Sequence, residues 1–134
     1  MGFAWDITVP KNTTITDPKE QILKLTYGVI VKIDIKFPRG CHNMVKIRLT
    51  RGGLKNVCPM NPDEWIIGDN ETVSFPMYYE IEDRPMQLEF TAISPETGYE
   101  HMITVRVSLL PRRVASMIPL IELLTKLLTR LFGV

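Results

Sequence analysis

The most regular feature of the sequence is an alternation of apolar and polar residues in four segments. In residues 29–37 the polar residues Lys32, Asp34 and Lys36 alternate with five apolar ones: Val29, Val31, Ile33, Ile35 and Phe37. A period of two places the two kinds of side chain on opposite faces of a strand. The pattern returns in residues 45–50, 88–92 and 103–109. We therefore expect four strands, each with one buried face.

Shorter apolar runs add four candidate strands, at residues 7–9, 21–26, 65–67 and 72–75. Residues that favour turns lie between these runs, and no segment before residue 111 has a helical period. Clean alternation is typical of antiparallel sheets that turn one face to the core. The sequence thus predicts an all-β domain over residues 1–110, an antiparallel β-sandwich of about eight strands with jelly-roll-like topology.

Residues 111–134 form a second predicted unit, a C-terminal amphipathic α-helix. Ser116 can cap its start and Gly133 can end it. The apolar residues cover about half of the helix surface, nearly twice the arc of about 100° that docking on one surface requires. The predicted interface residues are Met117, Leu120, Ile121, Leu124, Leu127, Leu128, Leu131 and Phe132.

The sequence leaves three uses open for this apolar face. The leucine spacing fits two heptads of a helical bundle, which favours a homo-oligomer or a contact with another component of an assembly. The helix could instead pack on its own sandwich, or lie on a membrane surface with Arg112 and Arg113 near its start. A length of about 24 Å is too short to cross a membrane.

Charge is unevenly distributed along the chain, although the formal net charge is only +1. Residues 11–55 contain ten Lys and Arg against three acids, and residues 63–100 contain ten acids against one base. Either the charges pair across strands of one sheet, or the subunit is dipolar and its basic side meets the acidic side of a neighbour. No aromatic residues are interleaved with the bases as in a single-strand platform, so nucleic acid is not an expected partner.

The sequence contains no arrangement that indicates an enzyme. It has no nucleophile elbow, zinc-protease motif, phosphate-binding glycine loop or Cys-x-x-Cys pair. Cys41, His42, Cys58 and His101 lack the short paired spacing of zinc ligands. We therefore expect no catalytic residue, no metal and no cofactor. The two cysteines are expected to be small buried thiols, although a single disulfide stays open.

Four aromatic residues suggest an alternative function, a ligand-binding β module for glycans. Trp65, Tyr78, Tyr79 and Tyr99 are candidates because aromatic faces stack on sugar rings, whereas packing in a core or interface is the more common use. The distinguishing sign is whether Trp65 and Tyr79 lie together on one exposed sheet face.

Four short motifs carry a resemblance to known proteins: residues 6–14, residues 37–41, Tyr78-Tyr79-Glu80, and residues 94–101. Through these motifs, residues 6–111 of the chain resemble a group of short, uncharacterised β proteins of phage-like and other mobile elements. In architecture it also resembles the single jelly-roll subunits of virion shells, vertices and decoration layers. The resemblance implies a non-enzymatic, oligomeric structural protein of a virion, assembled in the host cytoplasm. The N-terminus has no secretory pattern, which agrees with that location, and the helical tail departs from the resemblance.

Overall fold

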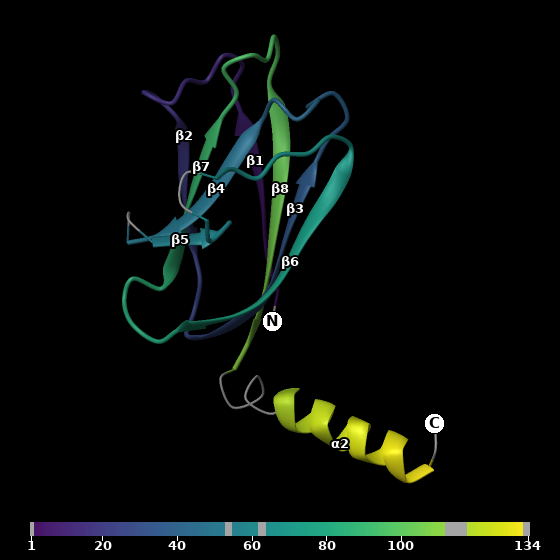
Figure 1. The fold of residues 1–134 in the computed structure, drawn as a ribbon. Helices are drawn as coiled ribbons and strands as arrows, with labels where there is room; N and C mark the ends of the chain where they lie inside the picture. Colours follow the sequence, from purple (N-terminus) through teal and green to yellow (C-terminus); the bar gives the residue numbers. More distant parts are fainter. Residues whose placement is uncertain (1, 53–54, 62–63, 112–117, 133–134) are drawn as a thin grey trace.

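The computed structural model describes residues 2–52, 55–61, 64–111 and 118–132. Eight strands form two antiparallel four-stranded sheets that pack face to face (Figure 1). The first sheet has the order β1 (Gly2–Val9), β8 (His101–Leu110), β3 (Gly28–Phe37), β6 (Glu71–Ile81). The second has the order β2 (Lys19–Lys24), β7 (Gln87–Ile93), β4 (Lys46–Arg51), β5 (Lys55–Cys58). The predicted all-β sandwich is therefore confirmed.

The strand pairing follows one simple rule. β1 pairs with β8, β2 with β7, β3 with β6 and β4 with β5, so the chain runs as one antiparallel ribbon. Two further pairings, β3 with β8 and β4 with β7, join successive parts of this ribbon into the two sheets. A folded ribbon of eight strands with this order is a jelly roll. The predicted topology is therefore also confirmed.

The core lies between the two sheets and consists of the inward side chains of the alternating segments. Ile33 and Ile35 of β3, Phe90 of β7 and Val105 of β8 are completely buried. Their polar neighbours in sequence face solvent, as the period of two predicts. The buried apolar side chains all come from residues 7–109, so among the described residues the helix adds nothing to this core.

The inward alternation of β3 breaks at one point. A register shift between Ile30 and Lys32 appears in the pairing of β3 with both neighbours, so the strand carries a bulge there. Ile30 is completely buried and Val31 is partly exposed. The prediction that Val31 faces the core was therefore wrong, because the bulge gives the inner position to Ile30.

The bounds of all four shorter predicted strands differ in the structure, where β1 begins at Gly2 instead of residue 7 and β2 covers residues 19–24 instead of 21–26. Residues 65–67 are not a strand, since only Ile66 forms an isolated bridge, to Ile47. The strand nearest to this segment in sequence is β5, which was not predicted. It has only four residues, and it begins with two polar ones that break any alternation. β6 continues beyond the predicted residues 72–75 through Pro76 to Ile81. Pro76 is compatible with this strand because β6 lies at the edge of its sheet.

The predicted C-terminal helix is present as α2 (Ile118–Phe132). It lies beyond the end of the sandwich at which β8 stops, and its axis leads away from the sheets (Figure 1). The predicted cap Ser116 and the interface residue Met117 lie outside the described residues. None of the helices in the described part of the chain is long and apolar enough to span a bilayer.

Candidate functional site

The first candidate surface is the apolar face of α2. Leu123, Leu124, Leu127 and Leu128 are each 46–55% exposed. Glu122, Lys126 and Arg130 are exposed as well. Among the described residues, the sandwich of the same chain therefore leaves these leucines uncovered. The predicted interface residues Leu120, Ile121, Leu131 and Phe132 also belong to the helix.

The second candidate surface is a groove on the side of the sandwich where β5 and β6 form the sheet edges. β5 has four residues and β6 has eleven, so the second sheet covers only part of β6. The inward side chains of Val73, Phe75 and Met77 therefore pack against the core but stay partly exposed. The inward residues Ile33 and Ile35 of β3, the neighbour of β6 in the sheet, are in contrast completely buried.

Two adjoining hollows make up this groove. One, of about 460 Å³, lies between residues 57–61 and residues 75–79. The other, of about 360 Å³, lies between Pro59, Asn61 and residues 64–67 on one side and the pair Val73 and Phe75 on the other. Pro59, Asn61 and Phe75 line both hollows, which are therefore continuous. We call the two together the β5–β6 groove.

Arginines of β4 hold the aromatic residues of this groove. The guanidinium of Arg48 lies 4.0 Å from the centre of the Trp65 ring and donates to the main-chain oxygen of Glu64 at 3.2 Å. The guanidinium of Arg51 lies 5.9 Å from the centre of the Tyr79 ring and donates to the oxygen of Asp83 at 2.7 Å. Two arginines of the basic segment, residues 11–55, thus donate hydrogen bonds to main-chain oxygens of the acidic segment, residues 63–100.

The four aromatic residues predicted for ligand binding do not form one platform. Trp65 lies outside the strands, in one hollow of the groove, and Tyr79 lies in the other. Tyr78 alternates with Tyr79 and is half exposed on the outer face of β6. Tyr99 lies in the loop before β8, with its ring centre 4.7 Å from that of His101. A glycan site would be favoured if Trp65 and Tyr79 lay together on one exposed sheet face. The structure does not place them in this way.

His101 and the two cysteines are buried. Both ring nitrogens of His101 are without a hydrogen-bond partner among the described residues. Cys41 and Cys58 are free thiols. Burial raises the pKa of Cys58 to about 12; burial, with the nearby Asp69 charge, raises the pKa of Cys41 to about 11. The described residues contain no group of three His, Cys, Asp or Glu side chains placed to hold a metal.

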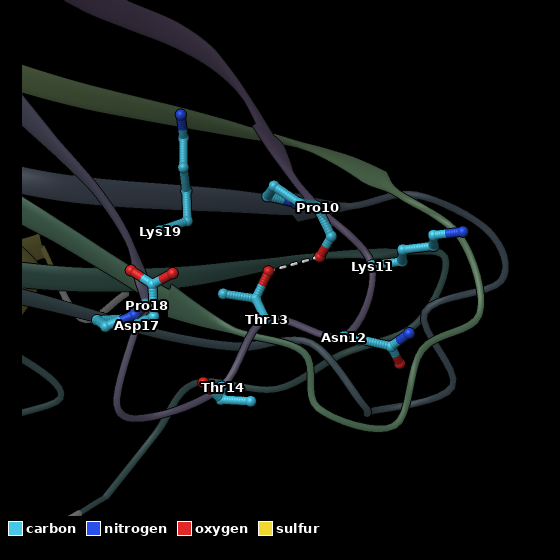
Figure 2. Close-up of a pocket in the computed structure, with 8 residues that line it drawn as sticks. All are labelled: Pro10, Lys11, Asn12, Thr13, Thr14, Asp17, Pro18 and Lys19. Carbon is cyan, nitrogen blue, oxygen red and sulfur yellow. Dashed lines mark hydrogen bonds between the residues drawn. The ribbon is translucent and has the colours of Figure 1, made fainter.

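A smaller hollow of about 290 Å³ lies in the loop between β1 and β2 (Figure 2). The hydroxyl of Thr13 is turned toward Pro10 and donates to its carbonyl oxygen at 2.7 Å. The Ser94 hydroxyl donates to the same oxygen at 2.7 Å, and the Ser94 amide donates to the Thr13 oxygen at 2.9 Å. These polar groups fasten the β1–β2 loop to the end of β7, so we assign the hollow a structural role.

Sequence reasoning missed the groove residues Val73, Phe75 and Met77. The signal was present, because apolar residues occupy every second position from Val73 to Ile81. Pro76 interrupts that pattern on the polar face, and for this reason the predicted strand ended at residue 75 instead of residue 81. The partial exposure of Val73, Phe75 and Met77 could not be predicted from sequence, because it depends on the short length of β5 across the sandwich.

No protein-family model matches the sequence, and no curated protein matches it. Among solved structures, the chain is similar to a protein described under "Bacillus endospore appendages form a novel family of disulfide-linked pili". The two are 14% identical, the match covers 82% of this chain and 88% of that chain, and the TM-score is 0.35. The function of this chain therefore has to be inferred from its own surfaces.

Proposed function

We propose that this protein is a non-enzymatic structural protein that assembles into a homo-oligomer through α2. The observation that carries the proposal is the exposed leucine row of the helix. Four neighbouring leucines at about half exposure form an apolar patch that monomeric proteins seldom leave in water. Burying a fully exposed Leu side chain contributes roughly 1.5–3 kcal/mol, so covering several half-exposed ones, each at about half of that value, favours association.

We further propose that the assembly is a virion, with the subunit in a capsid, vertex or decoration layer. The support is an analogy of fold, since jelly rolls are common in viral capsids and in lectins, and a fold by itself does not determine a function. Other virion proteins are then additional partners for the surfaces of the oligomer. Electron microscopy of the purified assembly, showing closed shells or rings, is the test of this part.

The test of the assembly is the solution mass of two chains, the full-length protein and a chain that ends at Pro111. Light scattering after size exclusion is expected to show a defined oligomer for the first and a monomer for the second. The truncated chain keeps every buried apolar side chain of the core, so its urea midpoint should stay close to that of the full chain. This second measurement separates loss of assembly from loss of folding.

Two point variants provide a matched control within the helix. Leu127→Glu introduces a charge into the leucine row and should lower the oligomer mass as truncation does. Thr129→Glu places the same charge on an exposed polar position two residues away and should leave the mass unchanged. A full-length chain that is monomeric at all concentrations, or a truncated chain with the full oligomer mass, contradicts the proposal. Association of the monomer with liposomes would then assign the leucine row to a membrane surface.

A further inference from the structure

We propose that the β5–β6 groove is the docking site for α2 of a second copy of the chain. This inference rests on the proposed function, because it names the surface that receives the helix in the assembly. The alternative within the same function is a bundle in which helices contact only helices. The groove is a stronger candidate than another helix because its floor, Val73, Phe75 and Met77, already packs against the core and lacks only a cover on its outer side.

The chemistry of the two surfaces matches. The groove presents Val73, Phe75 and Met77 from β6, and Met60, which is 79% exposed, from the opposite wall. Methionine and phenylalanine side chains adapt to an irregular apolar partner, which suits a row of leucines. A helix placed here would complete the cover that the four-residue β5 does not supply. An amphipathic helix in an apolar groove is also a recurrent mode of protein recognition.

The lengths of the two surfaces also match. α2 has fifteen residues and is therefore about 22 Å long. The segment of β6 from Val73 to Tyr79 is roughly 20 Å long at about 3.4 Å per residue. The helix is thus long enough to follow the whole groove, and its four exposed leucines, Leu123 to Leu128, span about 8 Å of that length.

The charges of the two segments have opposite sign. β6 and its flanking loops, residues 64–84, contain six acids and one base, Arg84, and two further bases at the groove are Arg48 and Arg51 of β4, so acids remain in excess. Residues 111–134 contain four bases and one acid, Glu122. Complementary charge of this kind favours one partner surface over others and speeds encounter. It also predicts that association weakens as salt screens the charges.

The placement of α2 favours a second copy over the same chain. The helix axis leads away from its own sandwich, so the leucine row and the groove are both open in one chain (Figure 1). A pair related by a two-fold axis covers both grooves with both helices. Each contact then occurs twice, which helps a helix-sized contact approach the roughly 1,600 Å² of total buried surface typical of stable interfaces.

The first experiment measures the mass and affinity of full-length groove variants. Met60→Glu changes an exposed side chain and should leave the fold intact, whereas Met77→Glu changes the partly buried floor of the groove. Both are expected to weaken association at least tenfold, as judged by sedimentation equilibrium. Thr72→Glu, on the exposed outer face of β6, is the matched control and should associate as the wild type does.

The second experiment reads the groove directly. Trp5 and Trp65 are the two tryptophans, so the full-length variant Trp5→Phe leaves Trp65 in the groove as the only reporter. A concentration-dependent blue shift of its emission is expected as α2 of a second copy covers the groove. Adding Leu127→Glu should abolish this shift, and raising the salt concentration should move it to higher protein concentration.

The outcomes separate this inference from the proposed function. If truncation at Pro111 dissociates the oligomer but Met60→Glu and Met77→Glu keep its mass and Trp65 stays unshifted, the groove assignment is wrong and assembly through α2 stands. Suppose instead that the protein is a monomer and that its Trp65 emission is blue-shifted, relative to the Leu127→Glu variant, at every concentration. That result means that α2 folds onto the groove of its own chain, and it also overturns the inference. If truncation changes nothing, the proposed function itself fails.

Discussion

At His101 the chain buries an imidazole against the Tyr99 ring without a hydrogen-bond partner for either nitrogen among the described residues. A buried polar group in this state costs stability, because it has lost its bonds to water. We expect His101→Phe to keep the ring contact, remove the cost and raise the free energy of unfolding by about 1 kcal/mol. Urea unfolding at neutral pH measures the difference.

The control for His101→Phe is Met102→Gln, one residue along β8 on the exposed face. Substitutions at such positions usually change stability by less than about 0.5 kcal/mol. A destabilised His101→Phe protein beside an unchanged control would mean that the imidazole makes a bond which Phe cannot replace.

The two cysteines predict a loss of stability at alkaline pH. In the folded chain the pKa of Cys41 is raised from 9.0 to about 11, and that of Cys58 to about 12, chiefly because burial disfavours the thiolate. Below pH 9 both thiols are protonated in the folded and unfolded chains, and their contribution to the free energy of unfolding is fully present. Above pH 9 the unfolded chain loses these protons first, so stability falls as pH rises toward 11 and 12.

This alkaline effect is measured by urea unfolding at pH 8 and at pH 10.5 under reducing conditions. The Cys58→Ala variant should lose less stability between the two values than the wild type, because it lacks the more strongly shifted thiol. All other residues are the same in the two proteins, so their effects cancel in the comparison. Equal losses in the two proteins would show that Cys58 does not contribute.

At the scale of single elements, the bulge of β3 makes a prediction that contradicts simple alternation. Ile30 is completely buried and Val31 is partly exposed. Ile30→Ala should therefore cost about 2–5 kcal/mol, the usual range for emptying a buried aliphatic site. Val31→Ala should cost less than about 1 kcal/mol. Chemical unfolding of the two variants decides, and the reverse order would place Val31 in the core and exclude the bulge.

The strands that sequence predicted well are those whose pattern was complete within the segment itself. The segments at β4, β7 and β8 alternate without a break and are half-buried, as expected. β5 was missed because Lys55 and Asn56 are poor strand formers and its place is set by pairing with β4. A strand was expected at residues 65–67 because Trp65 and Ile66 look like strand residues, but only the bridge of Ile66 to Ile47 forms.

The candidate site was predicted to a lesser extent. The leucine row of α2 followed from helical periodicity, since each leucine identifies its own face of the helix. The β5–β6 groove could not be predicted, because it results from the unequal lengths of two strands on opposite sheets. No local pattern reports that relation.

At the scale of the whole molecule, the uneven charge of the sequence does not divide the sandwich into two halves. β3 belongs to the basic segment and lies beside β6 of the acidic segment, while β7 of the acidic segment lies between β2 and β4. Thr50 of β4 donates to the carboxylate of Glu89 in β7 at 3.1 Å, which shows the two segments in contact. The opposite charges are therefore interleaved within the sheets.

The pairing of β1 with β8 also determines when the first sheet can be completed. Gly2 pairs with Ser108, and β8 is the strand that joins β1 to the rest of its sheet. A ribosome that has made the chain only as far as residue 100 has therefore produced β1 without its neighbour in the sheet. All-β domains with such distant pairings fold on the order of milliseconds to seconds, and their unpaired strands are prone to aggregate meanwhile. The order of synthesis thus makes β8 the last strand that the sandwich needs for its completion.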